Sequence, residues 1–313
     1  MKERVIIAVP ARIIKVRLED FLLAHFPSFS KMYLRDLVKT DACEVNGRLE
    51  NIGYRLCHND LVEIDVDHTR GRAMVREDIP LDIVFEDDHL LVVNKPAGML
   101  VHPSHRENSG TLLNALAHYL NRSVAIATTD AAGAVAPHLG ADSNIRPGLP
   151  HRLDKQTSGL IVVAKTADAH RRLSAAFMKK SVKKRYWALV EGLVGDDIGT
   201  IESMIGRFDD LKYWGVKPDG KPSESRFRVL KRFTDTTLIE MEPVTGRTNQ
   251  LRIHCHLIGH PIVGDVQRGG REYQRLCLHA YTLAFTHPVS RQFVSFTTGA
   301  PAFAGQHRSI PGA

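Results

Sequence analysis

A charged stretch, His151-Arg152-Leu153-Asp154-Lys155-Gln156-Thr157-Ser158-Gly159, runs directly into the apolar segment Leu160-Ile161-Val162-Val163. The pattern predicts a solvent-facing loop that is fixed by a buried strand, a common setting for a reacting side chain. The same residues also fit a surface turn in which Asp154 caps the Thr-Ser-Gly sequence. The local pattern therefore leaves two interpretations of Asp154, a functional carboxylate and a turn residue.

The segments on either side of this stretch predict one large domain over residues 80–303. We expect strands at residues 83–85, 90–93, 160–164, 186–190, 226–232 and 237–242, and helices at 111–120 and 168–180. The segment between 190 and 226 is expected to be irregular, and residues 125–147, rich in Ala, Gly, Thr, Asp and Pro, predict a mobile loop. Because no βαβ rhythm repeats, we expect an α+β fold with a mixed, mostly antiparallel sheet.

A small αβ module is expected at residues 14–67, followed by a polar linker at residues 68–79. Its first helix carries Leu18, Phe21 and Leu22, and Ser30 is the expected N-cap of a second helix. The Asn-Gly pair at residues 46–47 predicts a hairpin turn, and the alternation over residues 60–65 predicts a strand.

The second helix of this module is predicted to carry a basic face. Lys31, Arg35 and Lys39 recur every four residues, which places them on one side of the helix. Leu34, Leu37 and Val38 supply the opposite, core-facing side. The basic face fits either a surface that binds phosphates or an ordinary solvated helix face.

The composition fits a globular protein with a polyanionic partner. The 313 residues, of which 43% are hydrophobic, can fill a large core. Lys and Arg total 42 against 35 Asp and Glu, which gives a net charge of +7 and an isoelectric point near 9.3. This balance favours nucleic acid over an acidic protein partner.

The cysteines and the first residues predict the compartment. Cys43, Cys57, Cys255 and Cys277 show neither CxxC pairing nor dense spacing, so no zinc knuckle or disulfide framework is indicated and a reducing cytosol fits. The apolar run at residues 5–9 is too short for a signal-peptide core or a membrane span. We therefore expect a cytoplasmic protein with no membrane segment.

Five ordered motifs lie within residues 80–303. The first to be noted is His-Arg-Leu-Asp at 151–154 with Thr-Ser-Gly at 157–159. The others are Asp87-Asp88-His89-Leu90-Leu91-Val92-Val93-Asn94-Lys95-Pro96-Ala97-Gly98, Lys184-Arg185-Tyr186-Trp187-Ala188-Leu189-Val190, Gly246-Arg247-Thr248-Asn249-Gln250-Leu251-Arg252-Ile253-His254 with Gly259-His260-Pro261-Ile262-Val263-Gly264-Asp265, and Leu278-His279-Ala280. Together they resemble the RluA family of pseudouridine synthases, and the first resembles the family signature. Asn249 departs from the resemblance, because the family usually has His there; Asn can hydrogen-bond but cannot be charged.

The module at residues 14–67 resembles the S4 RNA-binding domain, in which two helices present basic residues to an RNA backbone. The resemblance implies that Lys31, Arg35 and Lys39 bind RNA. An S4-like module beside this catalytic domain resembles the branch that modifies ribosomal RNA. We therefore expect large-subunit ribosomal RNA as the target, with transfer RNA as the alternative, and a monomeric enzyme.

The family resemblance implies isomerisation of uridine to pseudouridine in RNA without a cofactor, with Asp154 as the catalytic carboxylate. It implies that Arg252 holds Asp154 ionised in a bidentate pair, with Arg247 as the second candidate. It also implies that Tyr186 packs on the target uracil and that Arg152 fills the space left when the base flips out.

Three further residues, together with Arg247, complete the expected site. Leu251 and Ile253 are expected to form an apolar wall of the uracil pocket. Lys184, in the basic run before Tyr186, and Arg247 are expected to contact phosphate.

Three alternatives compete with this assignment. His254, His256 and His260 suggest a metal site, but no carboxylate or cysteine spacing completes the ligand set, and Cys255 would point to the opposite face of a strand. A non-catalytic RNA-binding or ribosome-assembly factor on the same scaffold would be favoured by loss of Asp154, which is present. An RNA base deaminase needs a His/Cys zinc set that the chain lacks.

Overall fold

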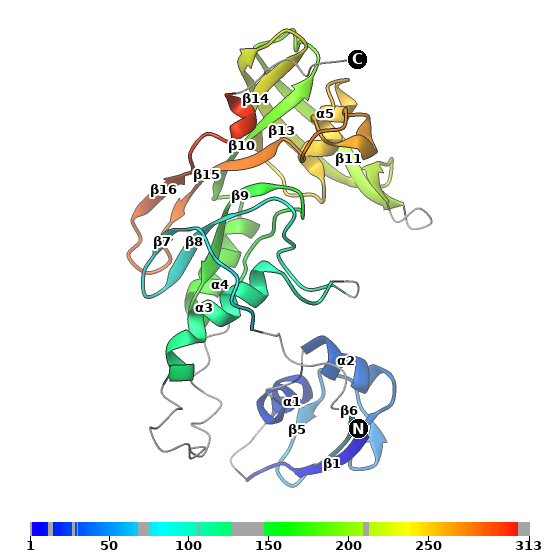
Figure 1. Cartoon of the computed structure of the whole chain (residues 1–313). Coiled ribbons are helices and arrows are strands. Elements are labelled where there is room, and N and C mark those ends of the chain that lie inside the picture. The colour runs from blue at the N-terminus through cyan, green and yellow to red at the C-terminus, as the bar shows by residue number, and fades with distance from the viewer. Residues whose placement is uncertain are drawn as a thin grey trace. The chain divides into compact units, whose positions relative to one another are not determined.

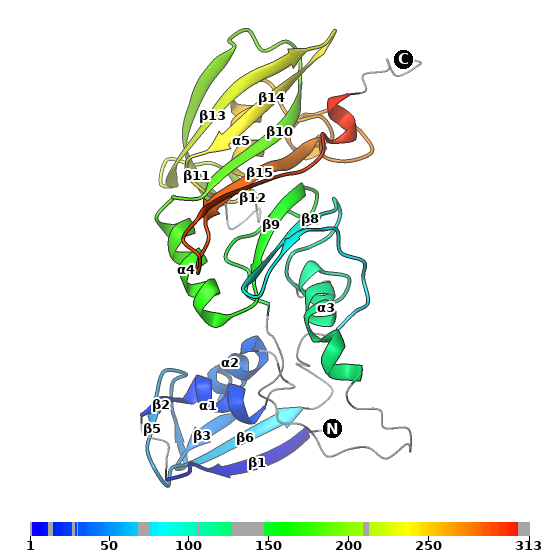
Figure 2. The same ribbon diagram turned by 90° about the vertical axis from the view of Figure 1, so that its left-hand side faces the viewer.

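The computed structural model describes residues 2–11, 15–26, 29, 31–67, 76–104, 107–126, 147–208 and 213–305 (Figures 1 and 2). The chain divides into two compact units, one built around Met1–Glu77 and one from Asp78–Arg122 with Ile145–Ala313. Ser30, the expected N-cap, residues 68–75 of the expected linker and residues 127–146 of the expected mobile loop lie outside the described residues. No helix in the described part of the chain is long and apolar enough to span a membrane.

Within the described residues, the smaller unit contains two helices and two small sheets. The elements are β1 (Lys2–Ala8), β2 (Val16–Arg17), α1 (Leu18–His25), α2 (Lys31–Lys39), β3 (Cys43–Val45), β4 (Arg48–Leu49), β5 (Arg55–Leu56) and β6 (Leu61–Asp67). The larger sheet has the order β1-β6-β3-β4, and β2 pairs with β5. The predicted hairpin turn between β3 and β4 is confirmed, because Asn46 and Gly47 both have positive φ, 52° and 72°.

The core of this unit lies between the helices and the four-stranded sheet. Leu18, Phe21 and Leu22 of α1 pack with Leu34 and Val38 of α2 against alternate residues of β6. Strand β1 pairs with β6, so this unit begins before residue 14. The sequence analysis missed β1 because an edge strand has a partner on one side only, and its side chains stay largely exposed.

The larger unit is built on a sheet that, in the described part of the chain, has ten strands. They are β7 (Ile83–Glu86), β8 (Leu90–Lys95), β9 (Ser158–Ala164), β10 (Lys183–Glu191), β11 (Ile198–Phe208), β12 (Tyr213–Val216), β13 (Lys221–Arg232), β14 (Thr236–Pro243), β15 (Leu278–Thr286) and β16 (Phe293–Thr297). The order is β12-β11-β13-β14-β10-β15-β9-β8-β7, with β16 on β15. Among the described strand pairs only β9 with β15 is parallel, which confirms the mixed, mostly antiparallel α+β fold.

The helices of this unit are α3 (Leu112–Ile126), α4 (Ala167–Met178) and α5 (Gln250–Leu257), with short 3-10 helices η2 (Val266–Arg268) and η3 (Ala302–Ala304). Figure 2 shows α3 and α4 on opposite sides of β8 and β9. Leu160 and Val162 of β9 pack in the cluster with α4, whereas Ile161 and Val163 pack in the cluster with α3. Both faces of β9 are therefore buried, which explains its unbroken apolar run.

Two predictions for this unit were wrong. The segment expected to be irregular contains β11 and β12; β11 has many polar residues, and its long pairing with β13 stabilises it as a strand. The segment carrying Ile253 and Cys255 is helix α5, not a strand. Its helical period was hidden because Gln250 and His254 are polar and yet buried, where serine hydroxyls bind them.

Candidate active site

The loop that carries Asp154 leads directly into β9, as predicted. Leu153 is buried in the core. The His151 ring stacks on Phe177 of α4 with centroids 4.4 Å apart, and its Nε2 lies 3.0 Å from the Val162 nitrogen, whose N–H donates to it. Burial lowers the pKa of His151 to about 3, so the ring stays neutral and can accept this bond. Both neighbours of Arg152 are thus fixed in the interior.

A buried lysine, Lys95 at the end of β8, also holds this loop. Its Nζ donates to the carbonyl oxygens of Pro96 at 2.7 Å, Met99 at 2.9 Å and Lys155 at 3.2 Å. The side chain is fully buried, and burial lowers its pKa to about 8. The residue after Asp154 is therefore tied to the turn that follows β8.

The end of the loop is joined to β15. Ser158 Oγ lies 2.7 Å from His279 Nδ1, His279 Nε2 lies 2.6 Å from Thr298 Oγ1, and the Arg275 guanidinium donates to Ser158 Oγ. Gly159 follows with φ +111°, and a Cβ placed on it would lie 2.3 Å from the Ala280 carbonyl oxygen. The close approach of β9 to β15 thus requires glycine at this position.

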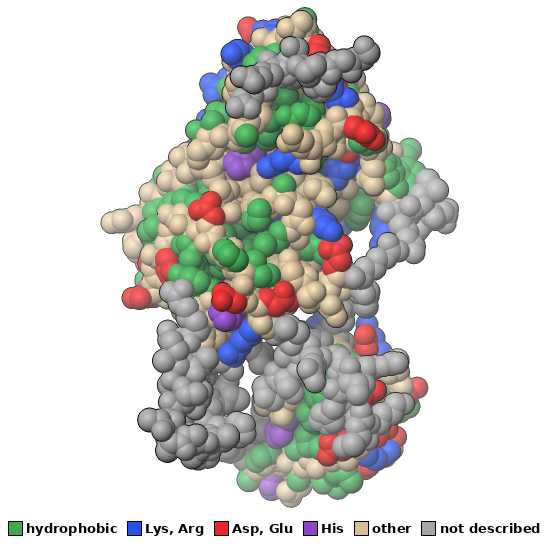
Figure 3. Space-filling view, viewed as in Figure 1, with side chains coloured by type: hydrophobic (Ala, Val, Ile, Leu, Met, Phe, Trp, Pro, Cys, Tyr) green, Lys and Arg blue, Asp and Glu red, His purple; other side chains and the backbone are tan. Residues whose placement is uncertain are grey.

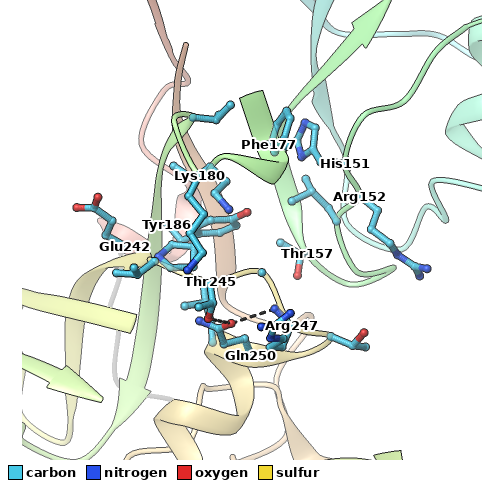
Figure 4. Close-up of a pocket in the computed structure, with 18 of the residues that line it drawn as sticks. His151, Arg152, Thr157, Phe177, Lys180, Tyr186, Glu242, Thr245, Arg247 and Gln250 are labelled. Atoms are coloured by element: carbon cyan, nitrogen blue, oxygen red, sulfur yellow. Dashed lines mark hydrogen bonds between the residues drawn. The ribbon is translucent and has the colours of Figure 1, made fainter. Parts of the chain in front are cut away.

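A pocket of about 730 Å³ opens beside the loop (Figure 4). Its lining comes from the Asp154 loop, the end of α4, β10, the end of β14 and the start of α5. The β14–α5 segment is braced from within: Gln250 Oε1 accepts from Thr245 Oγ1 at 2.6 Å and from the Arg247 N–H, with a nitrogen–oxygen distance of 3.0 Å. The pocket is therefore walled by segments that buried polar contacts hold in place.

Asp154 lines this pocket and is half-buried. Its carboxylate makes no hydrogen bond or ion pair with any residue that the structure describes. Burial raises its pKa above the usual value, while the positive charges of Arg252 and Arg152 act in the opposite direction. The Asp154 carboxylate is thus not bound by any described residue, although the positive charges of Arg252 and Arg152 act on it. Its carbonyl oxygen alone serves the turn, accepting from the N–H of Thr157 at 3.1 Å.

Arg252 lies in the same pocket, but its bidentate partner is Asp265 and not Asp154. Its Nε and Nη2 donate to the two carboxylate oxygens of Asp265 at 2.7 and 2.6 Å, and Nη1 donates to Asn249 Oδ1 at 3.3 Å. The expected pair between Arg252 and Asp154 is absent. A buried carboxylate costs more free energy without a cation than a partly solvated one, and Asp265 is the more deeply buried of the two, so the Arg252 guanidinium pairs with Asp265. Asn249 has φ 56°, a conformation that Asn tolerates, and there it helps to orient Arg252.

The structure brings Tyr186 and Leu251 together and separates them from Ile253. Tyr186 of β10 packs against the core cluster that contains Leu251, and both line the pocket. Burial, with the charge of Asp154 second, raises the Tyr186 pKa, so the phenol stays protonated. Ile253 is buried but does not line the pocket, since two positions along a helix turn a side chain by about 200°.

Arg152, Lys184 and Arg247 all line the pocket. Arg152 is exposed, makes no hydrogen bond or ion pair with any described residue, and in Figure 4 reaches away from Tyr186. Lys184 is half-buried, and burial lowers its pKa while Glu242 acts against that shift. Arg247 Nε donates to the Pro222 carbonyl oxygen at 3.1 Å. The basic side chains therefore differ in freedom, and Arg152 is the least restrained of the three.

In the smaller unit, Lys31, Arg35 and Lys39 are exposed along α2 as predicted. Lys31 Nζ lies 3.3 Å from Glu19, and Arg35 donates to the same carboxylate. The charge of this face is therefore partly neutralised. On the face shown in Figure 3, basic side chains are interspersed with acidic and apolar ones.

The three histidines considered for a metal site bind separate partners. His254 Nε2 lies 3.1 and 3.0 Å from the hydroxyls of Ser203 and Ser223. His256 Nδ1 lies 2.7 Å from the Arg268 carbonyl oxygen, and His260 Nδ1 lies 2.7 Å from that of Glu191. Within the described residues, no group of His, Cys, Asp and Glu is arranged to hold a metal ion.

The sequence analysis missed four residues that organise the site: Lys95, Asp265, Ser158 and His279. Each lies inside one of the quoted motifs, so the motifs marked them without giving a role. Their contacts, such as Ser158 with His279, join residues far apart in the chain. No local period could have revealed such pairs.

Comparison with known proteins gives a consistent result. The family model described as RNA pseudouridylate synthase matches residues 89–257. The chain is 37% identical to the "Uncharacterized RNA pseudouridine synthase YlyB" of Bacillus subtilis, over 91% of this chain and 90% of that protein. It is 36% identical to the "Ribosomal large subunit pseudouridine synthase D" of Neisseria meningitidis, over 96% of this chain and 80% of that protein.

Among solved structures, the human "RNA Pseudouridylate Synthase Domain Containing 1" is similar with a TM-score of 0.57 and 28% identity, covering 72% of this chain and 85% of that one. The sequence motifs, the fold and these relatives agree. The chain belongs to the family of RNA pseudouridylate synthases, enzymes that isomerise uridine to pseudouridine in RNA.

Proposed function

We propose that this enzyme acts on large-subunit ribosomal RNA and that Asp154 is its reacting carboxylate. The observation that carries the proposal is the state of that carboxylate: half-buried in the pocket, near Arg252 and Arg152, and bound to no described residue. Burying a carboxylate without a hydrogen-bond partner is costly. A group kept in that state is available to a substrate, which supports a catalytic role over the turn role.

The reaction breaks the bond between ribose C1′ and uracil N1 and forms a bond between C1′ and C5. A proton leaves C5 and one is taken up at N1, so the reaction is an isomerisation without net redox change or group donor. An ionised Asp154 suits two routes: addition to C1′ as N1 departs, or stabilisation of positive charge at C1′ with removal of a sugar proton. Both need the carboxylate deprotonated before the base leaves.

Arg252, Tyr186 and Leu251 support this chemistry in the proposal. Arg252 is fixed by Asp265 and Asn249, so its positive charge is oriented before substrate binds. Tyr186, a neutral phenol that lines the pocket, is proposed to pack on the uracil with its aromatic face, and Leu251 to close the apolar side. Ile253 supports the helix from the interior and is not assigned a contact with the base.

Arg152 is proposed to occupy the space that the flipped uridine leaves. Its guanidinium is exposed and unpaired within the described residues, so it can move into the duplex without breaking a contact. Lys184 and Arg247, in other parts of the pocket lining, are proposed to bind the phosphates that flank the target.

We infer that residues 14–67 form an S4-like module and that Lys31, Arg35 and Lys39 add RNA affinity there. On binding RNA, Lys31 and Arg35 would leave their ion pairs with Glu19 and bind a phosphate instead. The exposed Lys39 would bind an RNA phosphate directly. The names of relatives such as the Neisseria protein support a ribosomal target. We also propose a monomer, since the proposed catalytic residues all line one pocket of one chain. A cytoplasmic location is proposed because all four cysteines are free, which fits a reducing compartment.

Mapping pseudouridines in RNA from cells with and without the gene tests this function. We expect one or more positions in large-subunit ribosomal RNA to lose the modification and to regain it with the wild-type gene but not with Asp154→Asn. If every ribosomal pseudouridine persists and a transfer-RNA position is lost, the ribosomal assignment is wrong. Restoration by Asp154→Asn would refute the role of Asp154.

A further inference from the structure

Arg268 in η2 is a buried arginine to which the proposed chemistry gives no role. Its side chain is 2% exposed. Its Nη1 donates to the Tyr213 hydroxyl at 2.6 Å and its Nη2 to the Trp214 carbonyl oxygen at 2.8 Å. Its Nε is buried, has no hydrogen-bond partner among the described residues, and lies 4.0 Å from Asp265 Oδ2. A guanidinium keeps its charge when buried, so it is stabilised chiefly by a nearby carboxylate.

Asp265 therefore faces two arginines. Its side chain is 1% exposed, and its two oxygens are already bound by the fork of Arg252. Two positive charges against one negative charge leave this buried group with a net charge of +1. The ionised Asp154, which is sensitive to both Arg252 and Asp265, brings the four-residue group to neutrality.

If Arg268 were uncharged, the remaining three residues would carry a net charge of −1. Arg252 would then be the one arginine of the group left to offset two carboxylates, with only Arg152 and Lys95 adding positive charge toward Asp154. Asp265 already binds the two-nitrogen fork of Arg252. In a low-dielectric interior an uncompensated negative charge is removed by taking up a proton. Asp154 is the more solvated carboxylate, and no hydrogen bond from a described residue favours its ionised form, so it would take that proton.

We propose that Arg268 is a positioning residue that neutralises Asp265, so that the charge of Arg252 is left to keep Asp154 ionised for catalysis. The proposal rests on the role of Asp154 proposed above. Arg268 acts through Asp265 and Arg252 and makes no contact with substrate. Tyr213 and Trp214 of β12 orient the Arg268 side chain, and its guanidinium carbon lies 4.8 Å from the Tyr213 ring centroid.

The electrostatic directions agree with this geometry. Burial lowers the pKa of Arg268, and the charge of Arg252 acts in the same direction, whereas Tyr213, Asp265 and Asp154 act to raise it. Because an electrostatic interaction is mutual, Arg268 and Asp154 stabilise each other's charged form. The groups that face Asp154 are Arg252, Arg152 and Lys95, which lower its pKa, and Asp265, which raises it. Tyr186 also faces Asp154 but stays neutral.

The test is the pH dependence of single-turnover pseudouridine formation on a transcribed ribosomal RNA fragment. We expect Arg268→Gln to shift the acid limb of the profile to higher pH by about one unit or more. The rate at a given pH on that limb should therefore fall roughly tenfold, and it should return to the wild-type value at alkaline pH. Arg268→Lys should keep most of the rate. Arg271→Gln is the matched control: it removes a nearby arginine that pairs with Glu191 and Asp235, and should leave the acid limb in place.

Asp265→Asn gives a second, opposite prediction. The change keeps the shape of the side chain and removes the negative charge that raises the Asp154 pKa, so the acid limb should move to lower pH even though the rate falls. If Arg268→Gln does not fold, this variant still tests the coupling of Asp265 to Asp154 on which the proposal depends, and an acid limb that stays in place would overturn it. An equal loss of rate at every pH in both variants means that Arg268 only supports the fold, and the inference is overturned. If the wild type forms no pseudouridine, the proposed function fails instead.

Discussion

Gly159→Ala is expected to destabilise the catalytic unit because β9 and β15 meet there backbone to backbone. A Cβ at this position would lie 2.3 Å from the oxygen and 2.5 Å from the nitrogen of Ala280, closer than van der Waals contact permits. The φ of +111° costs a residue with a side chain about 1–2 kcal/mol. Separating the strands adds about 1–3 kcal/mol, as for an overpacked core. We therefore expect a loss of about 2–5 kcal/mol in the free energy of unfolding.

Thermal unfolding followed by circular dichroism measures this loss. For a domain of this size each kcal/mol lowers the melting temperature by about 2–4 °C, so the variant should melt about 4–20 °C below the wild type. Gly195→Ala is the control, because a Cβ there meets no atom within 4 Å and its φ is not positive. A Gly159→Ala protein that melts within about 2 °C of the control would refute the reasoning about this contact.

The same variant should slow catalysis at temperatures where it is still folded. Gly159 follows Ser158, whose hydroxyl is bound by His279 and Arg275, and that contact fixes the end of the Asp154 loop. A small displacement of a reacting group lowers the rate by up to about a hundredfold. Single-turnover rates that match the wild type would mean that the loop does not depend on this junction.

Three further predictions concern the cations and cofactors. On an RNA whose target uridine is already unpaired, Arg152→Met should recover much of its rate and Arg252→Met should not. The acid limb of the Arg252→Met pH profile should also move to higher pH, because Arg252 lowers the Asp154 pKa. Equal rescue of both variants would contradict separate roles for Arg152 in base flipping and Arg252 beside Asp154. Changing Lys31, Arg35 and Lys39 together to Gln should reduce the salt dependence of RNA affinity by about 1–3 in the log–log slope, and an unchanged slope would exclude phosphate contacts there. Activity should survive exhaustive chelation, apart from ions that fold the RNA; a protein-bound metal that restores activity on unstructured RNA would contradict cofactor-free catalysis.

The sequence predicted elements best where a local period was strong. The apolar runs predicted as strands at 90–93 and 160–164 were found because both faces of β8 and β9 are covered by helices. Helix α5 was missed because two of its buried residues, Gln250 and His254, are polar and bind serine hydroxyls. Strand β1 was missed because it is a largely exposed edge. Both elements are stabilised by contacts with residues distant in the sequence, and a local sequence period carries no information about such contacts.

The candidate site shows the same division. Motifs identified Asp154, Tyr186, Leu251 and Arg252, and the structure places all four on one pocket. The partner of Arg252 could not be predicted, because the choice between Asp154 and Asp265 depends on which carboxylate is more deeply buried. The depth at which each carboxylate is buried depends on the folded structure and could not be predicted from the sequence. The same is true of the contact between Arg268 and Asp265.

Tritium release from RNA labelled at uracil C5 tests the role of Asp154 most directly, since the C5 proton leaves only when the new bond to C1′ has formed. We predict stoichiometric release by the wild type and none above background by Asp154→Asn. RNA affinity should stay within a few-fold, because one carboxylate contributes little to binding a polyanion. Release by Asp154→Asn at even about a tenth of the wild-type rate, too small a loss for the reacting group, would contradict the assignment of Asp154 as the catalytic carboxylate.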